Sequence, residues 1–212
     1  GYNIMEVFSP QSKNATANWE YKPSTPTSSL AVATSRHIDF KSSGPVNLVV
    51  ANFFRGIMNS CVLLGFNSDS VDANPIWQYN VPGNCSVNLA LEGDSQPTLK
   101  FSDDGSTVVF AVSIFDPINE TNTPQLHCID GQNGSLNFVY ELINEEPGTN
   151  SVSLSRDGSR IAYGNGLIVY VLEKSTGHLL TKPLVRQVVS DVHICPMGVF
   201  LLYAINQGSV VR

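Results

Sequence analysis

Apolar and polar positions alternate along the chain in short runs, and one run returns with the same pattern. Residues 101–110 read Phe-Ser-Asp-Asp-Gly-Ser-Thr-Val-Val-Phe, and residues 154–163 read Leu-Ser-Arg-Asp-Gly-Ser-Arg-Ile-Ala-Tyr. In both runs a polar corner with Gly at the fifth position joins two apolar segments of strand length. Weaker copies begin at Phe40 and Ile194. The pattern predicts one repeated unit, two strands joined by a tight turn.

Apolar runs bounded by turn residues predict four strands in each of three units. The expected strands are 36–40, 46–54, 62–66 and 76–81 in the first unit, 98–102, 108–114, 126–129 and 136–142 in the second, and 151–155, 161–163, 168–172 and 179–184 in the third. A long loop is expected at 115–124. Residues 46–54 are nearly all apolar, as in an inner strand that is buried on both faces.

The two ends of the chain predict incomplete units. Residues 4–8 and 19–21 predict a hairpin, and residues 191–195 and 199–205 predict two strands, with the possible start of a third at 207–212. The shortest spacing between equivalent corners, from Leu154 to Ile194, is about one blade of a β-propeller. Four short strands per repeat and abundant turn residues favour a propeller over a sandwich.

The predicted fold class is therefore all-β, a β-propeller of four-stranded antiparallel blades. Three complete blades are expected at 30–82, 97–143 and 150–185, and half-blades at 1–26 and 189–212. If the half-blades pair, the chain closes as a four-bladed ring and loses its exposed sheet edges. Otherwise the chain is part of a larger propeller, or neighbouring copies complete one another's blades.

Two stretches resemble known repeat families. The pattern Phe-Ser-x-Asp-Gly-Ser-x-x-x-[Phe/Tyr] resembles the first turn of a blade in WD40-like and TolB-like propellers. Residues 126–138, Leu-His-Cys-Ile-Asp-Gly-Gln-Asn-Gly-Ser-Leu-Asn-Phe, resemble the PQQ-like repeat of quinoproteins, in which an Asp, a Gly and an aromatic residue bracket a turn. Residues 169–180 resemble a second copy without the Asp and the aromatic residue. The resemblances cover most of residues 30–205 and imply blade architecture, not a catalytic site.

Charge and composition narrow the function classes. The chain carries 12 Lys and Arg against 18 Asp and Glu, a net charge of -6, which argues against a nucleic-acid partner. Only 14% of residues are charged, so a polar and mostly neutral surface is expected. No apolar run approaches the roughly 18 residues of a membrane-spanning helix, and no membrane span is predicted. The start at Gly1 shows no signal-peptide pattern, so we expect a processed chain or a piece of a longer one.

Sequons favour a passage through the secretory pathway and an extracellular or cell-surface location. Four Asn-x-Ser/Thr sequons lie in polar, turn-like stretches. The predicted N-glycosylation sites are Asn14, Asn84, Asn119 and Asn133.

The even cysteine count is a second indication of an oxidising compartment. The chain has four cysteines and no Cys-x-x-Cys, so three pairings are open. Cys61 precedes the third strand of its blade and Cys85 follows the fourth, and a hairpin would bring them near one another. We therefore favour a disulfide between Cys61 and Cys85. Whether Cys128 pairs with Cys195 stays open, with buried thiols as the other arrangement.

Candidate metal sites are incomplete. His193 and Cys195 lie two apart on a predicted strand and would supply half a site, but no second pair of ligands stands at a recognisable spacing. Asn67, Asp69 and Asp72 offer oxygen ligands in a loop. This loop lacks the central Gly and distal Glu of an EF-hand, so a solvated Asx turn is favoured.

No catalytic residue, cofactor or metal ligand is predicted. His37, His127 and His178 have no neighbouring nucleophile motif. The remaining candidates are expected to serve the architecture, as aromatic packing residues or turn formers. These are Trp19, Trp77, Tyr79 and Phe138, and Asp103, Asp104 and Asp157.

The sequence thus predicts a non-catalytic, N-glycosylated propeller that acts as a binding or assembly scaffold, with a protein partner or a second copy. Two alternatives stay open. One is a fragment of a secreted propeller enzyme, quinoprotein-like or glycan-acting, which would need convergent acidic residues, calcium or a cofactor at the central channel. The other is a structural subunit of an extracellular filament or coat.

Overall fold

The computed structural model describes residues 5–8, 17–21, 29–34, 46, 48–54, 60–67, 74–86, 98–142, 150–185, 187–195, 197, 201–205 and 210–211. Every regular element within these residues is a β-strand, and the strands form five antiparallel sheets. The predicted all-β fold class is confirmed. The described part of the chain contains no apolar helix of membrane-spanning length.

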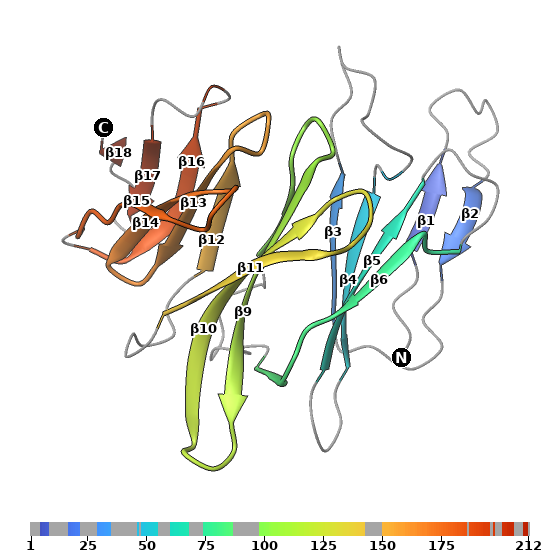
Figure 1. The fold of residues 1–212 in the computed structure, drawn as a ribbon, viewed down its shortest axis with the longest axis horizontal. Helices are drawn as coiled ribbons and strands as arrows, with labels where there is room; N and C mark the ends of the chain where they lie inside the picture. Colours follow the sequence, from blue (N-terminus) through green and yellow to red (C-terminus); the bar gives the residue numbers. More distant parts are fainter. Residues whose placement is uncertain are drawn as a thin grey trace.

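Three large sheets follow one another along the chain (Figure 1). The first consists of β3 (Ser29–Thr34), β4 (Leu48–Phe54), β5 (Ser60–Phe66) and β6 (Trp77–Asn80). The second consists of β8 (Thr98–Phe101), β9 (Thr107–Asp116), β10 (Thr121–Asp130) and β11 (Leu136–Glu141), with β7 (Asn84–Ser86) on the far part of β9. The third consists of β12 (Asn150–Leu154), β13 (Arg160–Asn165), β14 (Ile168–Glu173) and β15 (Leu179–Thr181).

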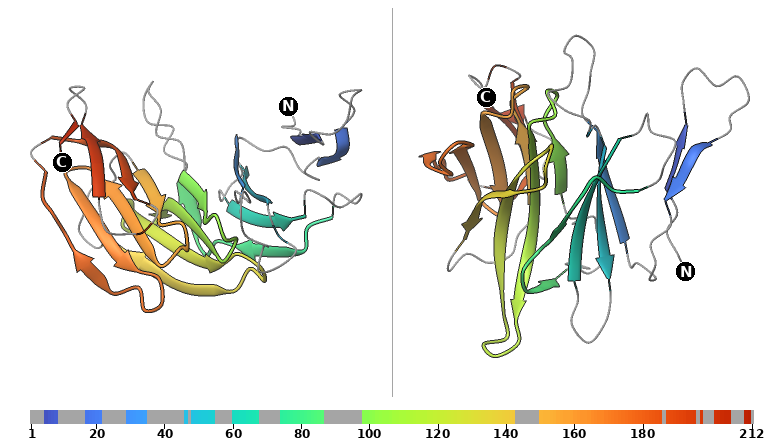
Figure 2. Two further views of the ribbon diagram at one scale, coloured as in Figure 1. Left: turned by 90° about the horizontal axis from the view of Figure 1, so that it is seen from above. Right: turned by 45° about the vertical axis from the view of Figure 1, so that its right-hand side comes forward.

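Two smaller sheets lie at the ends of this row. β1 (Met5–Phe8) pairs with β2 (Ala17–Tyr21), and β16 (Val189–Ile194), β17 (Leu201–Ile205) and β18 (Val210–Val211) form a three-stranded sheet. The first strands of successive sheets contact one another: β3 contacts β8, β8 contacts β12, and β12 contacts β16 of the C-terminal sheet. The sheets therefore radiate from these strands as propeller blades do, and Figure 2 shows them in chain order along a curved row.

The two terminal sheets are separate, with β1–β2 and β16–β18 at opposite ends of the row (Figure 2). The strands of the two ends therefore do not pair into one blade. Among the described strands, the structure therefore does not show the four-bladed ring that pairing of the two half-blades would form.

Neighbouring sheets bury an apolar core between their faces, and removal of these side chains from water is the main stabilising contribution. The first core joins β4 and β5 to β8 and β9, and the second joins β9 and β10 to β12, β13 and β14. The third core joins β13 and β14 to β16. Their members include Leu63, Phe101 and Phe110 in the first, Leu126, Tyr163 and Tyr170 in the second, and Val169, Val189 and Val192 in the third.

An aromatic side chain of one sheet lies on a glycine of the next. The Trp77 ring covers Gly134, where a Cβ would stand 2.8 Å from the ring, and its Nε1 donates to the carbonyl of Gly131 at 3.0 Å. Phe138 covers Gly177 in the same way, 2.9 Å from where a Cβ would be. The same contact therefore links the first sheet to the second and the second to the third.

A glutamine completes the first of these junctions. The Gln132 side chain donates to the carbonyls of Val46 and Gly105 at 3.0 and 2.6 Å, and accepts from the backbone N–H of Val46 at 3.0 Å. One amide thus satisfies backbone groups of two sheets, which would otherwise lose hydrogen bonds on burial.

The first large sheet begins with a strand that the sequence did not predict. This strand is β3, which pairs along β4 from Ser29↔Phe53 to Thr34↔Leu48. The predicted strand 36–40 lies outside the described residues and stays a prediction. Corner glycines 44 and 198 also lie outside the described residues, whereas Gly105 and Gly158 turn with φ of +72° and +65°.

The predicted long loop at 115–124 is instead the tip of a hairpin formed by β9 and β10. Strand β7 pairs with this extension, so its backbone groups have partners on both sides. The turn is held by the Asp116 carboxylate, which accepts from the backbone N–H of Ile118 at 2.8 Å and from the Asn119 side chain at 2.6 Å. Because residues 115–124 are rich in Thr, Asn and Pro, the sequence predicts a loop. The hydrogen-bonded pairing of β9 and β10 extends through them with β7 as an added strand.

Substitution Gly134→Ala tests the aromatic contact. Gly134 has φ +73° and touches the Trp77 ring, so the variant adds a steric clash to an unfavourable backbone conformation. We expect the free energy of unfolding to fall by about 3 kcal/mol in urea denaturation. Gly166→Ala is the matched control, because Gly166 has φ +57° with nothing within 4 Å of its Cβ position, and should cost about 1–2 kcal/mol. Equal losses in the two variants would contradict the contact.

Candidate functional site

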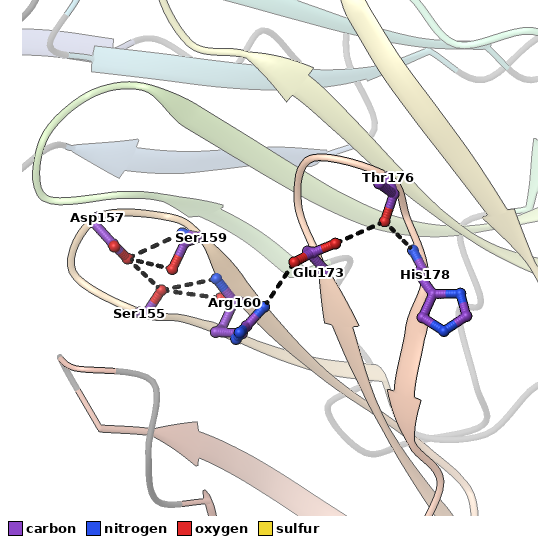
Figure 3. A network of polar contacts seen from close by, with 7 residues as sticks. All are labelled: Ser155, Asp157, Ser159, Arg160, Glu173, Thr176 and His178. Carbon is purple, nitrogen blue, oxygen red and sulfur yellow. Dashed lines mark hydrogen bonds and ion pairs between the residues drawn. The ribbon is translucent and has the colours of Figure 1, made fainter.

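The polar corner of the third sheet is a closed set of hydrogen bonds. The Ser155 hydroxyl donates to the Asp157 carboxylate at 2.8 Å and accepts from the backbone N–H of Arg160 at 2.9 Å. The backbone N–H and the hydroxyl of Ser159 donate to the same carboxylate oxygen at 3.0 and 2.9 Å (Figure 3). Such Asx-type bonds hold the backbone in a tight reversal, which the positive φ of Gly158 completes.

The corner of the second sheet repeats this geometry. The Ser102 hydroxyl donates to the Asp104 carboxylate at 2.7 Å. The backbone N–H of Thr107 donates to the Ser102 hydroxyl at 2.9 Å, and the backbone N–H of Ser106 donates to the Asp104 carboxylate at 2.9 Å. Asp104 and Asp157 are therefore turn formers, as the sequence predicts.

The Asp157 carboxylate is held ionised by these bonds. Burial acts to raise its pKa, but the bonds from Ser159 and Ser155 outweigh burial, and the pKa of Asp157 lies below its ordinary value. A carboxylate with this direction of shift is a poor general acid at neutral pH.

The corners of the second and third large sheets pack directly on one another. A Cβ on Gly158 would stand 2.8 Å from the Thr107 Cβ, so the third corner packs directly on the second. The Lys174 ammonium donates to the Ser106 hydroxyl at 3.1 Å. Beside the third corner, Arg160 pairs with Glu173 at 3.3 Å, and Thr176 donates to the other Glu173 oxygen at 3.0 Å (Figure 3).

A small hollow opens beside these two corners, where strands β8, β12 and β16 end. Its volume is about 80 Å³, far below the roughly 300–1,000 Å³ of typical small-molecule sites. The residues that line it are partly apolar and partly polar, and they include one aspartate and one arginine. The lining residues are Phe101, Ser102, Asp103, Leu154, Ser155, Arg156 and Ile194. A single side chain of a partner or a few water molecules would fill it.

Serines of β12 bond the backbone of β16 and so join the third sheet to the last one. The backbone N–H groups of Val192 and Ile194 donate to Ser151 and Ser153 hydroxyls at 3.1 and 3.0 Å. Ser151 also donates to one oxygen of Asp191 at 2.5 Å, and His193 lies 2.8 Å from the other oxygen.

This cluster does not have the order of a nucleophilic triad, because the carboxylate stands between the serine and the histidine. The Ser151 hydroxyl donates to the Asp191 carboxylate, which is a weak base because its pKa is lowered, and it accepts from the backbone N–H of Val192. Burial acts to raise the pKa of Asp191, but bonds from Ser151 and His193 lower it below its ordinary value overall.

The two residues of the possible half metal site lie at the end of β16. His193 is exposed at the edge of the cluster, and Cys195 follows it two residues later. Within the described ranges, no three His, Cys, Asp or Glu side chains gather into a metal-binding group. Asp69 and Asp72 of the possible calcium loop lie outside the described residues, as does His37.

His127 is buried in a hydrogen-bonded chain that spans two sheets. Its Nδ1 lies 2.9 Å from the Tyr79 hydroxyl of the first sheet, and its Nε2 lies 3.0 Å from Gln125 Oε1. Gln125 in turn donates to Glu141 at 2.9 Å, so its oxygen accepts from Nε2–H and Nδ1 accepts from Tyr79. This arrangement requires a neutral imidazole, and burial lowers the pKa of His127 to about 4.

The cysteines divide into one disulfide and two thiols. Cys61 and Cys85, the pair for which the sequence favours a disulfide, are bonded, with their Cα atoms 6.0 Å apart. Cys128 and Cys195 remain thiols. Burial raises the pKa of Cys128 to about 11, so its reactive thiolate form is suppressed at neutral pH.

Three of the four sequon asparagines lie in the described part of the chain. Asn119 and Asn133 are exposed in hairpin turns, and Asn84 is half-buried in β7. Asn14 lies outside the described residues. Trp77, Tyr79 and Phe138 take part in packing between sheets, whereas the side chain of Trp19 is outside the description.

Sequence reasoning missed the residues that join sheets: Gln132, the serines of β12, and the pair of Tyr79 and His127. The alternation of Ser151 and Ser153 on a predicted innermost strand was a usable signal. The pairing of Tyr79 with His127 had none, because the two are 48 residues apart.

No protein-family profile matches the sequence. No curated protein matches it either. Among solved structures, hydrazine synthase of Kuenenia stuttgartiensis is similar with a TM-score of 0.57 and 12% identity over 85% of this chain and 57% of that chain. The β-propeller domain of Cps50 (Swd1) from Myceliophteria thermophila is similar with a TM-score of 0.51 and 14% identity over 90% of this chain and 57% of that chain. The chain spans little more than half the length of either structure, and the likeness shows the β-propeller fold.

Acid titration tests the neutral state of His127. An unfolded histidine has a pKa near 6.5 and folded His127 one of about 4, so between these values the unfolded chain binds the extra proton. The free energy of unfolding should therefore fall as pH drops through this window, by a total on the order of 3 kcal/mol. His127→Gln should flatten this slope in urea denaturation. Parallel slopes in wild type and His127→Gln would refute the neutral assignment.

Proposed function

We propose that this chain is a secreted or cell-surface, N-glycosylated β-propeller that serves as a non-catalytic binding or assembly scaffold. The observation that carries the proposal is the buried disulfide between Cys61 and Cys85, because such bonds persist in oxidising compartments. The exposed sequons at Asn119 and Asn133 support the same location, since a glycan needs an accessible asparagine.

We further propose that the blades are of the WD40-like and PQQ-like kinds. The Ser-x-Asp-Gly-Ser corners at 102–106 and 155–159 support the first, and the aromatic side chains lying on Gly134 and Gly177 support the second. In both cases the motif residues position backbone and neighbouring sheets.

The binding surface we propose is the outer face of the last sheet. In β12, Ser151 and Ser153 face the next sheet and bond its backbone. The equivalent positions in β16 are Asp191 and His193, whose side chains are 50% and 68% exposed. The positions that hold one sheet to the next are thus polar and accessible here, and a polar partner surface or a second copy would bond them.

A scaffold agrees better with the described residues than an enzyme does. The ionisable groups at the corners and in the sheet interfaces are engaged in structural bonds, and the hollow beside them is too small for a cofactor.

Glycan removal tests the location. Expressed in a eukaryotic secretory host, the protein should lose mass on enzymatic deglycosylation. Thr121→Ala and Ser135→Ala remove the sequons of Asn119 and Asn133 without changing either asparagine, and each should abolish one glycan in intact-mass measurements. The control changes Thr123→Ala and Ser106→Ala lie outside every sequon and should leave the glycan mass unaltered. A wild-type mass equal to that of the bare chain would contradict secretion with glycosylation.

Sedimentation velocity over a range of concentrations tests assembly. We expect larger species as the concentration rises. His193→Asp places a second carboxylate beside Asp191 and should raise the concentration for association about tenfold, equivalent to about 1.4 kcal/mol. His178→Asp, on the turn before β15, is the control and should behave as wild type. A monomer at every concentration would rule out self-association and leave a different protein as the partner.

A further inference from the structure

One sequon coincides with a disulfide. Asn84, Cys85 and Ser86 form the sequon, and the same three residues form β7. Its central residue, Cys85, is bonded to Cys61, and both cysteines are almost fully buried, with exposed fractions of 0% and 1%.

The backbone around this sequon is fixed in the folded chain. Asn84, Cys85 and Ser86 pair with Phe115, Ile114 and Ser113 of β9. Just before the sequon, Gly83 has φ +94° and approaches Ile114 so closely that a Cβ would stand 2.7 Å from its Cγ2. The chain also bonds back to the first sheet through Val81 N–H and the Cys61 carbonyl at 3.0 Å. To present Asn84 to an enzyme, β7 would have to leave β9, and the disulfide holds it there.

The other described sequons differ in both respects. Asn119 and Asn133 lie in exposed hairpin turns, and neither has a cysteine within its sequon. Folding therefore leaves them accessible, whereas it withdraws the segment that contains Asn84.

The two reactions at this sequon use different atoms of neighbouring residues. In glycosylation, the Asn84 side-chain nitrogen forms a bond to the anomeric carbon of an oligosaccharide carried on a lipid pyrophosphate; the bond from that carbon to the pyrophosphate breaks, and the nitrogen loses a proton. In disulfide formation, the thiols of Cys61 and Cys85 lose two protons and two electrons, which reduce the disulfide of an oxidoreductase to a dithiol.

We propose that these reactions exclude one another at this site: a chain that forms the Cys61–Cys85 disulfide keeps Asn84 bare, and Asn84 is modified only in chains that have not formed it. The inference rests on the proposed passage through the secretory pathway. The order of the two events then selects between a bonded form with glycans at the turns alone and an unbonded form with an additional glycan beside the junction of the first two large sheets.

Glycopeptide mass spectrometry of the secreted full chain tests this exclusion. In wild type, peptides mapped without reduction should carry bare Asn84 whenever Cys61 and Cys85 are bonded. In Cys61→Ser, Asn84 occupancy should rise several-fold, while occupancy at Asn119 and Asn133 stays constant. Cys128→Ser, which removes a buried thiol outside the disulfide, should leave Asn84 as in wild type.

A variant that weakens folding but keeps both cysteines separates the bond from general unfolding. Leu63→Ala empties part of the core around Cys61, and Asn84 occupancy should remain at the wild-type level. A wild-type peptide with both the disulfide and a glycan at Asn84, or equal Asn84 occupancy in wild type and Cys61→Ser, would overturn the exclusion. Bare Asn119 and Asn133 would instead count against the proposed glycosylated scaffold, whatever happens at Asn84.

Discussion

Each sheet of this protein can bury its apolar faces only against a neighbouring sheet, and the distance between sheets is set by contacts of aromatic rings with glycines. Trp77 on Gly134 and Phe138 on Gly177 bring successive sheets within van der Waals contact at equivalent places. The cores between the sheets depend on that spacing, because apolar side chains stabilise the fold only where they pack closely and exclude water. The corners, the glutamine bridge and the serine bonds then satisfy the polar backbone groups that this close approach removes from water.

Several ionisable groups of the described residues serve the same architecture. Asp104 and Asp157 hold corners, His127 joins two sheets as a neutral imidazole, and Cys128 is a buried thiol. Groups that are engaged in this way have little freedom to take part in chemistry. Exposed polar groups include His193 in β16 and the asparagines in the hairpin turns at 119 and 133.

Local patterns were enough to predict the elements whose structure is decided locally. The alternation of apolar residues and the Asp-Gly corners gave the strands of the second and third large sheets, because side-chain period and turn chemistry act over a few residues. β3 and β7 were missed, since each becomes a strand only by pairing with a partner chosen by the whole fold. Gln132 and His127 were missed for a related reason: their roles depend on which sheets become neighbours, and no single sequence records that.

The disulfide also has a mechanical consequence. Cys61 and Cys85 are 24 residues apart, and they connect β5 of the first large sheet to β7 on the second. If the chain were pulled from its ends, the disulfide would carry the force past the residues between Cys61 and Cys85. These residues would not be stretched, and the extended length of the chain would be shorter by roughly 80 Å. The force would pass through the sulfur atoms rather than through β6, so the junction of these two sheets would resist tension longer than the junctions that follow it.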